Sequence, residues 1–298
     1  MSFVLRHTFK RRLARARDVH QARAVMNGGI FKAPADVQIT QVTPAGIPSE
    51  RVEGKSTSAG VLMYLHGGGY FACSARTHRP YTTAFARHGF LVFAPDYRLA
   101  PENRFPAAVE DAVAAWRAVR AEVTEESPMV IAGDSAGGGL ALATMLRLRE
   151  LGDPMPAAAA LFSPFTDLVG AGESRRTNSR RCAMFRHDVF RRAVDYYGGT
   201  LDPHDPLISP LYADLRGLPP LLIHVGEDET LRDDSTALAE KARAAGVAVQ
   251  LKLWPAVPHV WQLFHPFVPE GRQSLAEAAG FLAEAIQSAR VPARSNQL

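Results

Sequence analysis

The regular alternation of short apolar runs with longer amphipathic stretches constrains the fold of this 298-residue chain more than any other feature. Short apolar runs between turn residues are typical of buried strands, and the longer stretches have the period of helices. Two parallel strands need a crossover connection, usually a helix, so the alternation predicts an α/β fold with a largely parallel sheet flanked by helices. The expected strands are 61–65, 90–94, 129–132, 158–162, 221–225 and 247–254, and the expected helices are 77–88, 106–120, 136–151, 231–245 and a last one ending near Arg290.

The end of the chain carries one further helix signal. Ser274 and Glu277 have the spacing of a capping box, which predicts that the last helix begins there. Residues 292–298 are polar, and we expect them to be frayed.

Two segments do not follow the alternation. One is 1–35, and the other is 165–218, which is much longer than a crossover between strands requires. Insertions at strand ends of an α/β sheet usually lie over the ligand site. We therefore expect a single domain over 1–298 in which the segments 1–35 and 165–218 form a helical lid.

Composition and charge exclude several classes of protein. The net charge of +4 owes much to the basic stretch Arg6–Arg17, which has helical spacing. Such a stretch could contact nucleic acid or a membrane, be a transit peptide, or form the solvated face of an N-terminal helix. No nucleic-acid motif follows it and no other basic cluster is as dense, so we expect the solvated helix and no nucleic-acid partner. The chain shows neither the apolar core of a signal peptide nor a run of about 20 apolar residues. These patterns predict a cytoplasmic protein without stable membrane association.

The two cysteines, Cys73 and Cys182, form no CxxC motif and no cluster with histidine. A structural zinc site is therefore not expected, and free cysteines agree with a reducing compartment. No phosphate-cradling or dinucleotide-binding glycine motif is present either. The sequence predicts neither a metal nor a cofactor.

The motif Gly133–Gly137, of sequence GDSAG, lies between an expected strand and an expected helix. This is the setting of a nucleophile elbow, in which Ser135 would occupy a strained turn that exposes its Oγ. The flanking glycines leave room for that turn. The next helix points its N-terminus toward the site, which favours developing negative charge. Ser135 is thus the candidate nucleophile, and the alternative is a purely structural turn.

A second glycine motif follows the strand 61–65. In His66–Tyr70, of sequence HGGGY, successive glycines allow backbone N–H groups to face a cavity. Together with the N–H of Ala136, they would form an oxyanion hole for acyl-transfer chemistry. We expect His66 to hold this loop by hydrogen bonds and not to act as a base.

The base and the acid follow from chain order. If the catalytic residues occur in the order serine, acid, histidine, as in enzymes with this kind of nucleophile elbow, the base must follow an acid that itself follows Ser135. With the acid placed near residue 228, two of the ten histidines are left as candidates, His259 and His265. His259 is preferred because it lies in a loop just past the strand 247–254. Three consecutive carboxylates, Glu227–Glu229, follow the strand 221–225, and these patterns do not decide which of them is the acid. Asp167 is a distant alternative.

With these motifs, the chain resembles the hormone-sensitive-lipase family of α/β-hydrolases, in its microbial carboxylesterase branch. The motifs that carry the resemblance are HGGGY at His66–Tyr70, DYRLAPE at Asp96–Glu102, FPAAVED at Phe105–Asp111, GDSAG at Gly133–Gly137, and Pro258–His259. The resemblance implies an eight-stranded α/β-hydrolase sheet with a lid built from an N-terminal segment and an insertion. It also implies hydrolysis of short- to medium-chain acyl esters, without a cofactor, and a homodimer formed through the last edge of the sheet.

The resemblance also implies roles for individual residues. The oxyanion donors fall on Gly68, Gly69 and Ala136. The family usually has Asp-Pro-Leu-x-Asp at its acid, whereas this chain has Glu229–Asp233, of sequence ETLRD. Aligning the shared leucine and aspartate places Glu229 at the acid position and makes Asp228 the second choice.

Other residues of the motifs have expected structural roles. Asp96, Arg98 and Glu102 match the family's structural signature, and we expect a charge network that braces their loop. Phe71, Phe165, Tyr196 and Tyr197 are candidates for pocket walls, and core packing is an equal alternative for each.

The expected activity is that of a carboxylesterase acting on a small-molecule ester through a covalent serine intermediate. Three alternatives stay open at this stage. An amidase or peptidase would use the same triad, a lipase would act at an oil–water interface, and a ligand-binding member of the fold would not turn over its ligand.

Overall fold

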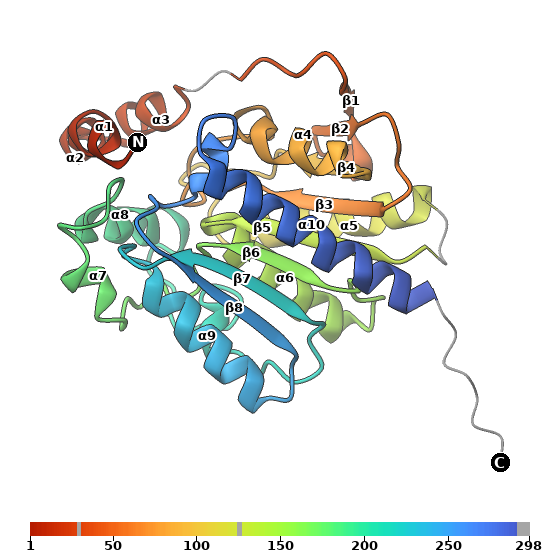
Figure 1. The fold of residues 1–298 in the computed structure, drawn as a ribbon. Helices are drawn as coiled ribbons and strands as arrows, with labels where there is room; N and C mark the ends of the chain where they lie inside the picture. The colour runs from red at the N-terminus through yellow and green to blue at the C-terminus, as the bar shows by residue number, and fades with distance from the viewer. Residues whose placement is uncertain (29–30, 124–126, 291–298) are drawn as a thin grey trace.

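A single eight-stranded sheet with helices on both faces organises the protein (Figure 1). The computed structural model describes residues 1–28, 31–123 and 127–290; the expected frayed end, 292–298, lies outside these ranges. The strand order is β1-β2-β4-β3-β5-β6-β7-β8. The strands are β1 (Gln38–Val42), β2 (Ser49–Glu53), β3 (Gly60–Leu65), β4 (Phe90–Pro95), β5 (Met129–Asp134), β6 (Ala159–Phe162), β7 (Leu221–Gly226) and β8 (Val249–Trp254). The predicted α/β-hydrolase fold, with its mostly parallel sheet, is confirmed.

Helices lie on both faces of the sheet and beyond the carboxyl ends of its parallel strands (Figure 1). They are α1 (Ser2–His7), α2 (Phe9–Arg15), α3 (Val19–Met26), α4 (Arg79–Arg87), α5 (Ala107–Glu122), α6 (Ala136–Leu151), α7 (Ser174–Thr177), α8 (His187–Tyr197), α9 (Arg232–Ala244) and α10 (Pro269–Arg290). No helix within these described ranges has the length and apolar content needed to cross a membrane.

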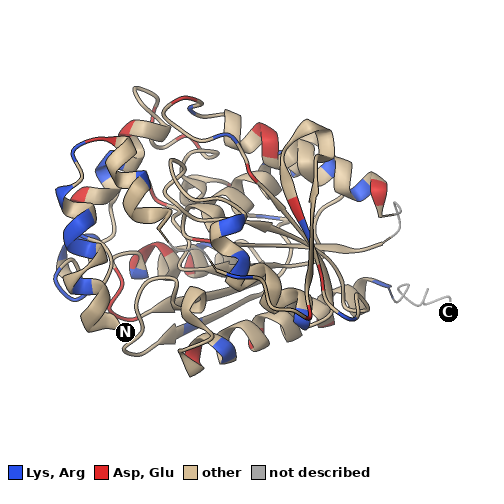
Figure 2. Ribbon diagram, turned by 90° about the horizontal axis from the view of Figure 1, so that it is seen from above, with Lys and Arg blue, Asp and Glu red and all other residues tan. Residues whose placement is uncertain are grey.

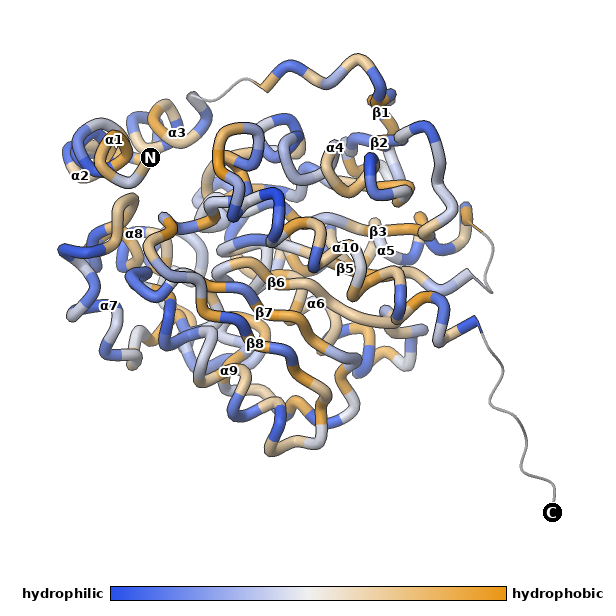
Figure 3. The backbone as a smooth tube through the Cα atoms, viewed as in Figure 1, coloured by the Kyte–Doolittle hydropathy of each residue, from blue (hydrophilic) through white to orange (hydrophobic). Residues whose placement is uncertain are grey.

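Alternation along the strands divides the core into two layers. Leu62 and Tyr64 of β3 belong to the layer that contains residues of α4 and α10, whereas Val61, Met63 and Leu65 belong to the layer that contains residues of α5, α6 and α9. Hydrophobic residues accordingly follow the central strands (Figure 3). Strands buried on both faces read as continuous apolar runs, which is why they could be located from sequence.

Two features of the sheet differ from the expectation. β1 and β2, which were not predicted, pair antiparallel with each other, and β2 pairs antiparallel with β4. β1 (QITQV) has exposed and half-buried polar residues, and β2 (SERVE) contains three charged side chains, so neither is a continuous apolar run like the central strands. An edge strand of an antiparallel pair needs only one apolar face, so its sequence signal is weaker.

The capping box proposed for the last helix is wrong. α10 begins at Pro269, and Ser274 lies inside it, where its hydroxyl accepts a hydrogen bond from the Gln262 amide and contacts His224 Nδ1. Glu277 instead pairs with Lys252 of β8. The same spacing of serine and glutamate places both on one face of a helix interior, so the pattern could not distinguish the two situations.

The two segments outside the alternation lie together, at the carboxyl ends of the parallel strands (Figure 1). Lys10 of α2 donates hydrogen bonds to the carbonyl oxygens of Ser179 and Cys182, at 2.7 and 2.6 Å. Arg192 of α8 donates to the Ala16 carbonyl oxygen at 2.7 Å. Segments more than 160 residues apart in the chain are therefore fastened to each other.

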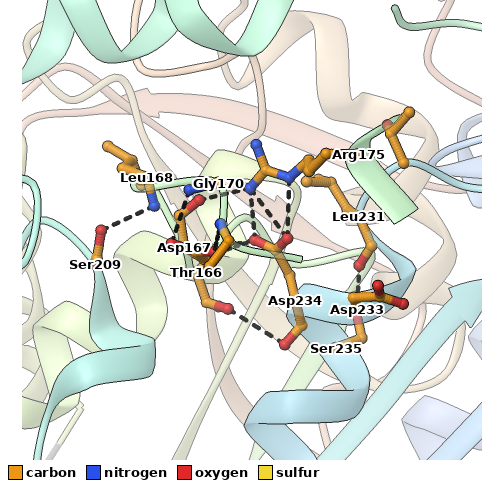
Figure 4. Close-up of polar contacts among 12 residues, drawn as sticks. Thr166, Asp167, Leu168, Gly170, Arg175, Ser209, Leu231, Asp233, Asp234 and Ser235 are labelled. Carbon is orange, nitrogen blue, oxygen red and sulfur yellow. Dashed lines mark hydrogen bonds and ion pairs between the residues drawn. The ribbon is translucent and has the colours of Figure 1, made fainter. Parts of the chain in front are cut away.

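A buried ion pair attaches the insertion to the sheet layer (Figure 4). The Arg175 guanidinium contacts both carboxylate oxygens of Asp234, at 2.9–3.1 Å, and lies over the rings of Phe165 and Phe190. Asp234 also accepts the backbone N–H groups of Thr166 and Asp167. The start of α9 is thus bonded to the beginning of the insertion.

Replacing Arg175 by Met should lower the free energy of unfolding by about 3–5 kcal/mol, because Asp234 would stay buried without its countercharge. Urea unfolding followed by circular dichroism measures this loss. The double variant Arg175→Met with Asp234→Asn should lose clearly less than the single one. An unchanged urea midpoint for Arg175→Met would show that the pair does not support the fold.

Candidate active site

Ser135 occupies a strained turn between β5 and α6. Its φ and ψ are 51° and −121°, a conformation that non-glycine residues rarely adopt. The backbone on both sides holds it: Ser135 N–H donates to the Phe162 carbonyl, and its own carbonyl accepts the N–H of Phe165, each at 2.8 Å. A Cβ at Gly133 or Gly137 would overlap a neighbouring backbone carbonyl. The motif thus requires glycine on each side of the serine for packing reasons.

His259 and Glu229 form a fully buried pair. The Nδ1 atom of His259 lies 2.5 Å from Oε2 of Glu229, and the other carboxylate oxygen accepts the Ser163 hydroxyl and the Gly226 N–H, both at 2.7 Å. The Nε2 atom of His259 is buried and has no hydrogen-bond partner among the described residues. One ring nitrogen is therefore fixed by the carboxylate, while the other is free to accept a proton.

The other carboxylates of this turn point elsewhere. Asp228 pairs with Arg181 at 2.7 Å, and Glu227 is exposed. Asp167, the distant alternative, accepts the N–H groups of Gly170 and Ala171 in the insertion. The Asn178 amide reaches from the insertion to the carbonyl oxygens of Glu227 and Glu229 and holds this turn.

The second histidine considered as a base lies outside the cavity. His265 ends the short helix after His259 and does not line the cavity that contains Ser135. Glu229 is thus bonded to His259, and His259 lines the same cavity as Ser135, whereas Asp228, Asp167 and His265 do not line it.

The glycine motif after β3 lines the same cavity as Ser135. Gly68 and Gly69 have φ values of 121° and 63°, and both face the cavity. Ala136 is buried at the first position of α6, directly after Ser135. Among the hydrogen bonds of the described residues, none uses the N–H groups of these three residues. They are free to bind an oxyanion.

His66 is held within its own loop. Its Nδ1 atom lies 2.7 Å from the Gly67 carbonyl oxygen, its ring stacks on Tyr97, and the Tyr97 hydroxyl donates to the His66 carbonyl. Burial lowers the pKa of His66 to about 3, so that its ring is neutral at neutral pH. His66 therefore acts as a structural residue of the loop.

Asp134 joins the serine turn to the glycine loop, a role that sequence reasoning missed. Its Oδ1 atom accepts the Tyr64 hydroxyl at 2.7 Å and the Gly67 N–H at 3.0 Å, and its Oδ2 atom lies 3.3 Å from His78 Nε2. Burial alone would raise the pKa of Asp134, but His78, Tyr64 and Gly67 together lower that pKa. The carboxylate is ionised, and it fixes the residue that precedes Gly68. In the sequence, this role was indicated by the position of a charged residue next to Ser135, in a motif whose other residues are small.

The signature residues Asp96, Arg98 and Glu102 brace their loop separately, since no ion pair joins them in the described structure. Asp96 accepts the Ala75 N–H at 2.6 Å, and Arg98 pairs with Asp111 of α5. Glu102 pairs with Arg23 of α3. The three side chains brace their loop as expected, but each does so through a different element and not through contacts with the other two.

Arg23 ties the N-terminal segment to the glycine loop. Besides Glu102, its guanidinium donates to the Phe71 carbonyl at 2.6 Å and to the Ala100 carbonyl at 2.8 Å. Arg23 lies outside all the motifs identified in the sequence. Only its contacts show that it links α3 to both loops.

Four of the candidate residues, Ser135, His259, Gly68 and Gly69, line a cavity of about 500 Å³. Apolar side chains from three parts of the chain supply most of the remaining wall. These include Leu5, Phe9, Val25, Phe71, Phe165, Met184, Phe185, Val189, Phe190 and Leu263. Tyr196 and Tyr197 do not line it; Tyr197 stacks on Tyr70 in the core. No group of three or more His, Cys, Asp or Glu side chains able to hold a metal occurs among the described residues.

Comparison with known proteins agrees with this fold. A family model described as the alpha/beta hydrolase fold matches residues 62–263. An acetyl-hydrolase from Streptomyces hygroscopicus is 43% identical over 86% of this chain and 84% of its own length, and an esterase from Acinetobacter venetianus is 35% identical over 85% and 84%. The crystal structure of an esterase from the bacterial hormone-sensitive lipase family superposes with a TM-score of 0.91, at 41% identity, over 96% of this chain and 98% of that one.

The chain belongs to the α/β-hydrolase family. Within that family it is similar to the hormone-sensitive-lipase esterases, as the sequence motifs predicted.

Replacing Asp134 by Asn should lower kcat for a short-chain ester by about tenfold, with a smaller effect on KM, because the glycine loop loses a charge-assisted hydrogen bond. Tyr64→Phe is the matched control, since it removes another hydrogen bond to the same oxygen without touching the loop. Steady-state kinetics of both variants would decide the point. Equal kcat losses in the two would contradict a specific role in holding the loop.

Proposed function

We propose that this protein is a carboxylesterase that hydrolyses short- to medium-chain acyl esters through an acyl-enzyme intermediate on Ser135. One observation carries the proposal. His259, held by a buried hydrogen bond to Glu229, lines the same cavity as a serine in a strained strand-to-helix turn. That combination is the requirement for activating a serine hydroxyl.

In the first half of the reaction, Nε2 of His259 takes the proton of Ser135 Oγ as the oxygen attacks the ester carbonyl carbon. The carbonyl π electrons move to its oxygen, which binds the N–H groups of Gly68, Gly69 and Ala136. The helix α6, whose N-terminus begins at Ala136, adds a favourable dipole. When the tetrahedral intermediate collapses, His259 gives its proton to the leaving alcohol.

Water completes the cycle. His259 takes a proton from a water molecule that attacks the acyl carbon, and the second tetrahedral intermediate uses the same oxyanion donors. Its collapse breaks the bond to Ser135 Oγ, which takes the proton back from His259. The carboxylic acid then leaves, and the enzyme returns to its starting state.

Glu229 has two tasks in this scheme. It accepts the Nδ1–H of His259, which leaves Nε2 unprotonated and directed for proton transfer, and it stabilises the imidazolium that forms. Ser163 and Gly226 hold its other oxygen, so the carboxylate cannot rotate away from the ring. A glutamate is longer than the aspartate usual in the family, and these two hydrogen bonds position the longer side chain.

The size and lining of the cavity support a small, largely apolar substrate. A volume of about 500 Å³ is within the range of small-molecule sites. α1–α3 and α8 supply much of the wall, and we propose that 1–35 and 165–218 act as the lid of this cavity. The short- to medium-chain range follows from the enclosing aromatic side chains Phe71, Phe185 and Phe190.

We further propose a cytoplasmic location and a homodimer. Two free cysteines, one buried and one half-buried, support a reducing compartment. The dimer would use the edge strand β8, whose outer backbone edge pairs with no other strand of the described sheet.

Hydrolysis of p-nitrophenyl esters from acetyl to palmitoyl tests the activity. We expect the highest kcat/KM for short chains, a decline toward palmitoyl, and loss of turnover in Ser135→Ala. A matched anilide should be hydrolysed far more slowly than its ester. Faster anilide cleavage would indicate an amidase, a preference for emulsified long chains a lipase, and binding without turnover a non-catalytic protein.

The choice of acid has its own test. Glu229→Gln should lower kcat by roughly 10²- to 10⁴-fold, because the amide cannot fix the ring tautomer or stabilise the imidazolium. Asp228→Asn is the matched control on the adjacent residue, and its kcat should stay within about twofold of wild type, since its partner is the exposed Arg181. The reverse order of effects would assign the acid to Asp228.

A further inference from the structure

One cationic side chain lines the otherwise largely apolar cavity. Arg12 of α2 is the single lysine or arginine among the described residues of the cavity wall. Its side chain is exposed, and it forms neither a hydrogen bond nor an ion pair with any described residue. A guanidinium at this position is available to a ligand.

The backbone that carries Arg12 is held firmly. Leu13 is buried to 1% exposure, Lys10 donates two hydrogen bonds to the insertion, and Arg192 donates to the Ala16 carbonyl. The basic neighbours Lys10 and Arg192 are thus used to fasten the helix. Arg12 is presented to the cavity from a fixed helix, which reduces the cost of ordering it on binding.

No acidic side chain of the cavity wall is free to neutralise Arg12. Asp134 is the single acid among the described lining residues, and Tyr64, Gly67 and His78 occupy its two oxygens. Glu229 lies behind His259 and is bonded there. The described lining residues therefore supply no free countercharge for Arg12, and an anionic group of the substrate is left to pair with it.

The surroundings of the entrance reinforce this preference. Residues 1–28 contain seven lysines and arginines and one aspartate. Basic residues gather at the end of the molecule formed by the N-terminal helices, α7 and α8 (Figure 2). A positive field around the entrance raises the local concentration of anions and their association rate.

We propose that the natural ester carries an anionic oxygen group, such as a carboxylate, at the end remote from the scissile bond, and that Arg12 binds it at the rim of the cavity. Arginine suits this role because its planar guanidinium binds carboxylates through two hydrogen bonds. The inference rests on the proposed function, and it names the substrate class. The apolar wall between the rim and Ser135 would contact the chain that joins the two groups.

Matched substrates test the proposal: monomethyl esters of dicarboxylic acids of increasing length, each compared with the ester whose far end is a neutral carboxamide. In wild type, kcat/KM should favour the carboxylate at one or two chain lengths. Arg12→Gln should lower the carboxylate-to-carboxamide ratio roughly three- to tenfold, mainly through KM. Added salt should lower the wild-type ratio as well.

Arg11→Gln is the control, because it removes the same charge from the neighbouring, exposed residue, which does not line the cavity. Its ratio should equal that of wild type. Thermal unfolding checks that Arg12→Gln is folded.

Three results would overturn the proposal: no preference in wild type at any length, a ratio unchanged in Arg12→Gln, or an equal fall in Arg11→Gln. These results count against the proposal only when the wild-type protein hydrolyses the carboxamide esters. If neither member of any pair is hydrolysed by folded wild type, the proposed function fails, and the inference fails with it.

Discussion

The buried carboxylate of Asp134 is the interaction on which the geometry of the site depends. Asp134 is the last residue of β5 and immediately precedes Ser135, and it accepts a hydrogen bond from Gly67 in the loop after β3. The serine turn and the glycine loop are thereby held against each other by one ionised group with three partners. Such a group is costly to bury, and its full set of hydrogen bonds is what makes its burial tolerable.

The acid–histidine side of the site is supported from a different direction. Glu229 leaves the sheet after β7, and its carboxylate is fixed by Ser163, Gly226 and His259. The backbone around it is held by Asn178 from the insertion, and the start of α9 is fastened by Arg175. Residues of the insertion therefore both line the cavity and hold the turn that carries Glu229.

Much of the fold and the central residues of the site were predictable because their signals are local. Continuous apolar runs located the parallel strands, and the GDSAG motif located the strained turn around Ser135, since tiny residues are required there. β1 and β2 were missed because the polar residues of β1 and the charged residues of β2 interrupt any such run. The capping box failed because serine and glutamate three residues apart have the same spacing inside a helix as at its start.

The sequence by itself determined the order and type of the main elements, the nucleophile candidate and its glycine loop, because short-range sterics and hydrophobic burial govern these features. It narrowed the acid to a run of three carboxylates. Only the tertiary structure decided which carboxylate faces His259, that Asp134 and Arg23 join separate loops, and that Arg12 enters the cavity wall. These features depend on contacts between residues far apart in the chain, and side-chain direction at such contacts is set by packing of whole elements, which no local pattern records.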